Sequence, residues 1–218
     1  IRIGHHLIDS IFMETEILSA DHPVVFRHAF DILKHGGTVV FPTDTVYGLA
    51  ALPFNEDYVE RLYVVKGRNS ARAIALLISD LSELDKVSVS PSGHAKKLAE
   101  KLWPGPLTLV VPRHPDLPEV LAPLPTVGVR VPDHPVSLKL LSITGPLAVT
   151  SANRSGRENT NTAKEAFHQL QGHVDLIIDG GRSPGGVPST VVDCTSPDLK
   201  ILRPGPISQF DLDRAVSN

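Results

Sequence analysis

Three basic side chains follow a loop of small hydroxyl residues in the first third of the chain. The loop, residues 42–45, comes directly after the apolar run 38–41, so it should lie at the carboxyl end of a strand, where open α/β sheets bind ligands. Lys66, Arg68 and Arg72 come one predicted helix later. Threonine hydroxyls can hydrogen-bond a small polar molecule, and lysine and arginine side chains can hold a polyphosphate. Because no nucleophile is evident, the pattern indicates binding and activation of an anionic nucleotide.

The same residues also have a purely structural interpretation. Asp44, within the Thr-Asp-Thr loop, is typical of a local turn. Lys66 and Arg68 suit the basic end of a helix that faces the helix dipole, with Gly67 as its C-cap. On spacing alone, this structural interpretation is the more common one.

Further polar residues follow other predicted strands. Strand ends on one side of a sheet converge, so these side chains are expected to share a cleft. The residues are Thr43, Thr45, Arg130, Ser151, Asn153, Ser189, Thr190 and Arg203. Each of them taken singly has an ordinary alternative, such as a turn or a surface ion pair.

The alternation of apolar runs and helical spacing predicts the elements that position these residues. Strands are expected over 11–18, 38–41, 73–78, 107–111, 127–131, 147–150, 174–178, 190–193 and 200–202. Helices are expected over 21–36, 56–65, 90–102, 134–144 and 162–172, with a short one over 208–217. The glycine-rich segment 180–186 is expected to be a mobile turn rather than a phosphate cradle. Because several strands follow one another closely late in the chain, we predict one mixed-sheet α/β domain.

Composition excludes several classes of protein. The chain has 218 residues, 41% hydrophobic and 21% charged, with a net charge of −3, which describes a globular protein without a global attraction to nucleic acid or membrane. The single cysteine, Cys194, excludes an intrachain disulfide and a cysteine-based zinc site. No run approaches the ~18 apolar residues of a membrane span, and we see no signal peptide, so a cytoplasmic protein without membrane contact is expected. The histidines follow no metal-ligand spacing, the P-loop motif is absent, and no metal site is predicted.

Seven motifs together carry a family resemblance. They are PTDTVYGL (42–49), KGR (66–68), WPGPLT (103–108), VRVP (129–132), TSAN (150–153), PSTVVD (188–193) and RPG (203–205). In this order and spacing, the chain closely resembles the YrdC-like threonylcarbamoyl-AMP synthases over about residues 24–208. The resemblance implies a single α/β domain with a twisted mixed β-sheet flanked by helices around a large basic cleft. Residues 1–23 would then be an N-terminal extension and 209–218 a C-terminal tail.

The resemblance also implies a reaction. Such a nucleotidyltransferase converts L-threonine, bicarbonate or CO2, and ATP into threonylcarbamoyl-AMP and pyrophosphate. Mg²⁺ would accompany ATP without a dedicated protein site. The product would pass to a separate tRNA threonylcarbamoyltransferase, which forms threonylcarbamoyladenosine (t6A) next to the anticodon. Contact of the chain itself with tRNA is a further expectation.

Residue roles carry over from the matching motifs. Threonine would be held by Thr45, Arg130, Ser151 and Ser189. ATP would be held by Lys66, Arg68, Arg72, Thr126, Asn153, Asn161 and Arg203, with Lys66 and Arg68 as the catalytic residues that stabilise charge on the phosphates. Tyr47, in the first motif, would line the cleft.

The sequence departs from the family pattern at a few positions. Asn69 follows Arg68 where many members have proline, Arg72 replaces an asparagine, and Leu77 replaces a histidine. The loss of that histidine puts one threonine contact in doubt. Asn161 stands where a threonine often contacts ATP. Some members carry a second domain after this one, and we expect the present chain to lack it.

Two alternatives remain open at this point. A basic cleft could grip double-stranded RNA or tRNA without catalysis, although the acidic balance of the chain counts against it. The second alternative is the related carbamoyl-adenylate domain of hydrogenase-maturation carbamoyltransferases, although that domain lies inside much longer chains.

Overall fold

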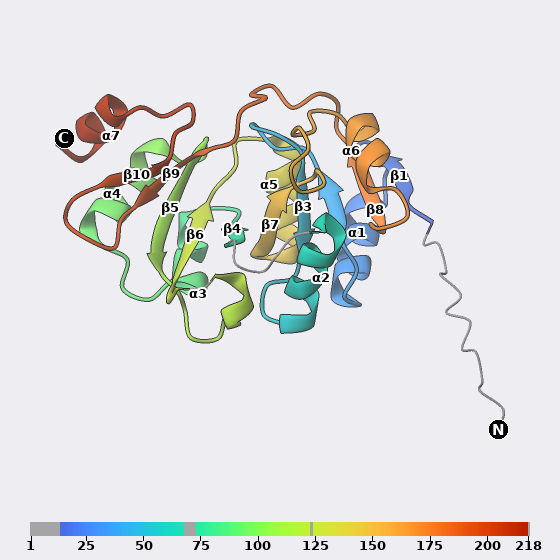
Figure 1. The fold of residues 1–218 in the computed structure, drawn as a ribbon, viewed down its shortest axis with the longest axis horizontal. Coiled ribbons are helices and arrows are strands. Elements are labelled where there is room, and N and C mark those ends of the chain that lie inside the picture. Colours follow the sequence, from blue (N-terminus) through green and yellow to red (C-terminus); the bar gives the residue numbers. More distant parts are fainter. Residues whose placement is uncertain (1–13, 68–72, 123, 218) are drawn as a thin grey trace.

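A computed structural model describes residues 14–67, 73–122 and 124–217 of the chain (Figure 1). The strands are β1 Glu16–Ser19, β2 Val39–Phe41, β3 Gly48–Ala51, β4 Ala75–Leu77, β5 Leu107–Pro112, β6 Thr126–Arg130, β7 Leu147–Ser151, β8 Leu176–Asp179, β9 Thr190–Asp193 and β10 Lys200–Arg203. The helices are α1 Val25–Lys34, α2 Glu56–Lys66, α3 Leu84–Val87, α4 Gly93–Leu102, α5 Pro135–Thr144, α6 Ala163–Leu170 and α7 Gln209–Ser217. Two short 3-10 helices, η1 Leu81–Glu83 and η2 Glu119–Leu121, complete the described part.

All of these strands form one sheet, in the order β1-β8-β2-β3-β7-β4-β6-β5-β9-β10. The pairs β1–β8, β2–β8, β4–β6 and β5–β9 are parallel, and the other neighbouring pairs are antiparallel. The predicted single-domain α/β fold with a mixed sheet is therefore confirmed.

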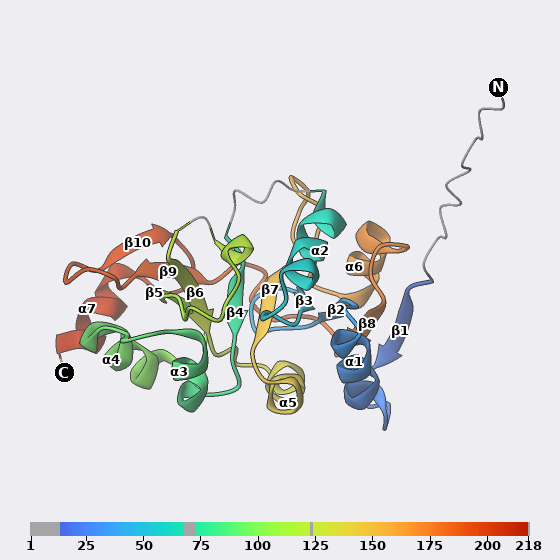
Figure 2. The same ribbon diagram turned by 90° about the horizontal axis from the view of Figure 1, so that it is seen from below.

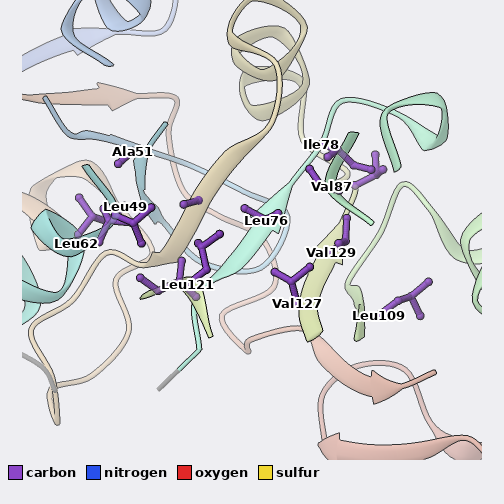
Figure 3. Close-up of a cluster of buried hydrophobic side chains, with 14 of the residues drawn as sticks. Leu49, Ala51, Leu62, Leu76, Ile78, Val87, Leu109, Leu121, Val127 and Val129 are labelled. Carbon is purple, nitrogen blue, oxygen red and sulfur yellow. The ribbon is translucent and has the colours of Figure 1, made fainter. Parts of the chain in front are cut away.

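Helices cover both faces of the half of the sheet that contains β2, β3, β7 and β8. Figure 2 shows α1 and α5 on one side of these strands and α2 and α6 on the other. One core cluster lies under α1 and α5, and the second, larger cluster includes buried residues of α2, α4, α6 and α7. Figure 3 shows the larger cluster running from Leu49 and Leu62 through Leu76 to Val129 and Leu109. Burial of this apolar surface is the main force that holds the layers together.

On the other half of the sheet, one face is not covered by any α-helix of the described part of the chain (Figure 2). Val149 and Leu77 belong to the cluster beneath α1 and α5. In register with them, Arg130 lies beside Leu77, and Ala75 lies beside Val149. Paired residues point to the same face of a sheet, so this face continues from β7 onto β4 and β6. On these two strands the face carries Arg130 and extends away from α1 and α5.

Local signals placed most elements within a few residues, with three differences. β3 was not predicted, because its sequence Gly-Leu-Ala-Ala has low intrinsic strand propensity and is held by pairing with β2 and β7 on either side. α1 begins at Val25 rather than at 21, and its N-cap Val24 makes no side-chain capping bond. The short helices, those between 81 and 87 and the 3-10 helix η2, were also not predicted.

The sheet and the core extend beyond residues 24–208 at both ends. β1, from the expected N-terminal extension, pairs with β8 at the edge of the sheet. α7, from the expected C-terminal tail, packs on α4 and buries Leu212 and Ala215 in the larger core cluster. β1 and α7 therefore belong to the same sheet and core as residues 24–208, although they lie outside the limits predicted from the family motifs.

No helix in the described ranges is long and apolar enough to cross a membrane.

Candidate active site

A cavity of about 560 Å³ opens on the uncovered face of β4, β6, β5 and β9. Its wall combines hydroxyl groups, two guanidinium groups and small apolar side chains. The polar lining residues are Thr43, Thr45, Thr108, Thr126, Thr150, Ser151, Asn159, Ser189, Arg130 and Arg203, with Tyr47 among the remaining lining residues. A volume of this size suits a nucleotide-sized ligand. Six of the eight polar residues predicted at strand ends lie on this wall, whereas Asn153 and Thr190 do not.

Arg130 lies at the end of β6 and is almost completely buried, with 5% of its surface exposed. Its Nε donates a hydrogen bond to the Gly105 carbonyl (2.9 Å), and its Nη1 donates to Thr45 Oγ1 (3.0 Å). Its Nη2 makes an ion pair with Asp44 Oδ1. Among the described residues, these bonds use three of the five guanidinium N–H groups, so two are left for a ligand.

Asp44 therefore does more than make the local turn that its sequence context predicted. Its side chain reaches Arg130 and also accepts a hydrogen bond from the Asp133 backbone N–H (3.1 Å). The neighbouring hydroxyls of Thr43 and Thr45 are hydrogen-bonded to each other at 2.9 Å. Sequence analysis did not include Asp44 among the site residues. Its position could have indicated this role, because Asp44 lies between two threonines of the site and a buried arginine needs an acidic partner.

Arg203 enters the cavity from the opposite edge, on β10. It donates to the Ser189 carbonyl from Nε (3.1 Å) and from Nη2 (2.8 Å), and Nη2 also lies 3.1 Å from Ser189 Oγ. The Ser189 hydroxyl is in turn hydrogen-bonded to Thr108 Oγ1 at 2.7 Å. Within the described part of the chain, all hydrogen bonds of Arg203 thus go to a neutral residue. An anion in the cavity would supply the charge that these contacts lack.

The two guanidinium groups differ in their electrostatic environment. Burial lowers the pKa of Arg130, Asp44 opposes this effect, and the nearby charge of Arg203 lowers it further. Desolvation of the inner part of the Arg203 side chain lowers the pKa of Arg203 as well. Both groups remain cationic at neutral pH, because arginine begins with a pKa far above it. Their mutual repulsion is therefore relieved by any bound anion.

Lys66 does not lie on the cavity wall. It is the last residue of α2 and is buried, with 4% of its surface exposed. Its Nζ donates to the carbonyls of Ser151 (2.5 Å) and Asn153 (2.7 Å), and it lies 3.2 Å from Asn153 Oδ1. Gly67, with φ of 58°, is the C-cap of this helix as predicted. Direct contact between Lys66 and phosphate stays a prediction, while the structure shows Lys66 supporting the end of β7 at Ser151 and the loop that follows it.

The predicted site residues divide into three groups. Those that line the cavity together are Thr45, Thr126, Arg130, Ser151, Ser189 and Arg203. Lys66, Asn153 and Asn161 are not among the lining residues. Arg68 and Arg72 lie outside the described residues. Leu77, which replaces the family histidine, is buried and lines the cavity beside Arg130.

The glycine-rich segment 180–186, predicted to be a mobile turn, is bonded to the loops around the site. Gly186 N–H donates to the Thr45 carbonyl (2.7 Å), and Ser183 N–H donates to the Asn161 carbonyl (2.8 Å). Gly185 packs so closely that a Cβ there would lie 2.6 Å from the Asp44 carbonyl oxygen. The Tyr47 hydroxyl donates to the Gly181 carbonyl (2.6 Å), and burial raises the pKa of Tyr47 to about 12. The segment thus holds the 42–47 loop from outside.

Comparison with known proteins identifies the family. Residues 31–205 match the family model Sua5/YciO/YrdC, which is described as telomere recombination. The chain is 39% identical over 205 residues to the threonylcarbamoyl-AMP synthase of Bacillus subtilis, covering 93% of this chain and 59% of that protein. The chain belongs to the Sua5/YciO/YrdC family.

Two solved structures share the fold. Sua5 of Pyrococcus abyssi in complex with L-threonine superposes with a TM-score of 0.86 at 34% identity, over 94% of this chain and 60% of that one. YciO of E. coli superposes with a TM-score of 0.79 at 30% identity, over 90% of this chain and 97% of that one. The chain thus spans about three-fifths of the length of the B. subtilis and P. abyssi relatives.

Proposed function

We propose that this protein is an L-threonylcarbamoyladenylate synthase. It would join L-threonine, bicarbonate or CO2, and ATP to give threonylcarbamoyl-AMP and pyrophosphate. Its B. subtilis relative carries that name, and the P. abyssi relative binds L-threonine.

The observation that carries the proposal is the meeting of Arg130 and Arg203 with a set of hydroxyls in one cavity. Arg130 already has a carboxylate partner and two N–H groups left, which suits hydrogen bonding to an amino-acid carboxylate. Arg203 has only neutral partners in the described structure, which suits a more highly charged phosphate. An amino acid and a nucleotide could thus lie side by side between the two guanidinium groups.

The chemistry requires positioning rather than a protein nucleophile. The threonine amine adds to CO2, loses a proton and becomes a carbamate. A carbamate oxygen then forms a bond to the α-phosphorus of ATP, and the bond from that phosphorus to the bridging oxygen breaks as pyrophosphate leaves. Holding two anions within reach of each other is unfavourable in water, so cationic groups and excluded solvent would supply most of the acceleration.

Mg²⁺ is expected to accompany ATP, where it would neutralise phosphate charge. The described residues contain no cluster of three or more histidine, cysteine or acidic side chains that could hold an ion by themselves. The oxygens on the cavity wall are mainly hydroxyls, which fit an ion that is already held by phosphates and water. The ion would therefore enter with the nucleotide.

The product is a mixed anhydride of a carbamic and a phosphoric acid, which needs an acceptor. We propose that a tRNA threonylcarbamoyltransferase consumes it to form t6A, and that both steps take place in the cytoplasm. Direct binding of tRNA by this chain is a separate part of the proposal.

The deciding experiment is pyrophosphate release from Mg-ATP by the full chain, with threonine and bicarbonate each present or omitted. Release that requires both would support the synthase. Release with ATP alone would mean a different acceptor. No release by a folded protein that binds RNA with a steep salt dependence would instead favour a binding module.

Two substitutions make the same assay specific to the cavity. Arg203→Ala should raise the KM for ATP, because it removes a guanidinium from the wall. Arg113→Ala is the matched control, since Arg113 follows β5 on the same half of the sheet, does not line the cavity, and donates to the Pro118 carbonyl. Equal loss in both variants would contradict the assignment of the cavity as the ATP site.

A further inference from the structure

Asp44 lies directly behind Arg130 and does not line the cavity. We propose that Asp44 is a positioning residue, which holds Arg130 in the orientation that receives the carboxylate of the amino-acid substrate. The inference rests on the proposed function, because it takes that carboxylate as the ligand of Arg130. Asp44 would thus affect substrate binding only through the side chain of Arg130.

The orientation of the Arg130 guanidinium is set by three partners from two segments of the chain. Gly105, from the turn before β5, accepts from Nε, and Thr45 accepts from Nη1. Asp44 supplies the third partner and the only charged one in this set. Two N–H groups stay available on the same guanidinium, so the three contacts decide where those groups point.

Asp44 is itself held in place on both sides. Its Oδ1 accepts from the Asp133 N–H at 3.1 Å, and only 11% of its side chain is exposed. The glycine-rich segment packs on its backbone at Gly185. A carboxylate fixed in this way can fix its partner, which a solvent-exposed carboxylate cannot do.

Charge gives a second reason for the pairing. Without Asp44, the buried Arg130 would face the charge of Arg203 with only neutral partners of its own. A buried charge that loses its partner tends to move or to draw in water. The two N–H groups meant for the substrate would then be displaced or used elsewhere.

The test compares Asp44→Asn with the wild-type chain by steady-state pyrophosphate release and by equilibrium binding of radiolabelled L-threonine. The asparagine keeps the shape and an oxygen for the Asp133 N–H, but it removes the charge. The KM and Kd for threonine should rise by roughly ten- to a hundredfold, the range for one misplaced hydrogen bond to a charged group. The KM for ATP should change less than about threefold, since Arg203 and Ser189 are untouched. Asp133→Asn is the matched control, because its exposed carboxylate takes no part in this network.

A double variant separates positioning from a general loss of structure. If Asp44 acts only through Arg130, Asp44→Asn should add nothing to the threonine defect of Arg130→Gln. Additive defects would overturn the proposal. If Asp44→Asn does not fold, Asp44→Glu keeps the charge and shifts it by one methylene, and it should still raise the KM for threonine but not that for ATP.

The results also distinguish the proposed function of the chain from the proposed role of Asp44. A wild-type chain that neither binds nor uses threonine would overturn the proposed function. A wild-type chain that binds threonine, together with an Asp44→Asn variant that binds it equally well, would overturn the role of Asp44 alone.

Discussion

Replacing Lys66 by methionine tests whether this lysine supports the site from behind. Methionine keeps an unbranched, flexible side chain that can occupy the buried space, but it has no donor. The ammonium group now donates to two carbonyls, those of Ser151 and Asn153, and lies near Asn153 Oδ1. The substitution therefore isolates the hydrogen bonds from the packing.

The size of the effect follows from what each acceptor retains. Ser151 O also accepts from the Asn153 N–H, and Asn153 Oδ1 also accepts from the Ser151 hydroxyl at 2.6 Å. Among the hydrogen bonds of the described chain, the Asn153 carbonyl has Lys66 as its donor. Leaving one buried carbonyl without a donor and removing a charged donor from the others should cost about 2–4 kcal/mol of unfolding free energy. Removing the buried charge of Lys66 would by itself raise the unfolding free energy. This ammonium group is, however, already surrounded by oxygens that take the place of water.

The assay combines urea denaturation with pyrophosphate release. Lys66→Met should lower the unfolding free energy by that amount and should raise the KM for both threonine and ATP, because Ser151 and Asn153 lose their common support. Lys101→Met is the control, since Lys101 lies exposed in the last turn of α4. Unchanged stability with a higher KM for ATP alone would refute the supporting role and indicate direct phosphate contact.

Three other substitutions test separate parts of the site. Arg203→Lys should raise the KM for ATP more than that for threonine, because an ammonium cannot reproduce the fork of hydrogen bonds to Ser189, and equal changes would contradict this division of the cavity. Gly185→Ala should lower kcat/KM at least about tenfold, because its Cβ would lie 2.6 Å from a backbone oxygen of the 42–47 loop, whereas Gly93→Ala, with nothing within 4 Å, should have little effect in the same assay. The raised pKa of Tyr47, about 12, favours the protonated phenol in the folded state, so its contribution to stability is complete below pH ~10 and is lost as the pH rises toward 12. Tyr47→Phe should lose about 1 kcal/mol near neutral pH and should flatten the fall in stability above pH 10, as measured by urea unfolding across that range. An equally steep fall in the Phe variant would show that Tyr47 is not its source.

Signals that depend on nearby residues predicted the fold well. Thr162 caps α6 at the predicted start of this helix by accepting from the Glu165 N–H at 3.2 Å, and Gly67 ends α2 in a left-handed conformation as predicted. The Glu165 carboxylate in turn accepts a hydrogen bond from the Asn161 N–H at 2.7 Å. β3 escaped prediction because its strand character comes from neighbours far away in the sequence. Capping and periodicity are local, whereas strand pairing is not.

In the candidate site, too, residue types were predicted from the sequence whereas long-range contacts were not. The residue types at strand ends and their family order predicted most of the polar side chains that line the cavity, although the predicted residues Lys66, Asn153 and Asn161 are not among them. They did not predict what each cation would bond to, since the partner of Arg130 lies 86 residues away and that of Lys66 lies 85 to 87 residues away. A buried cation must find oxygens somewhere, but nothing local determines which ones. Three cations that look alike in the sequence therefore acquire different tasks: Arg130 is paired and oriented, Arg203 keeps neutral partners and is suited to an anion, and Lys66 holds the loop behind the wall. It follows that in this chain the role of a cation is better judged from its partners in the folded structure than from its place in a motif.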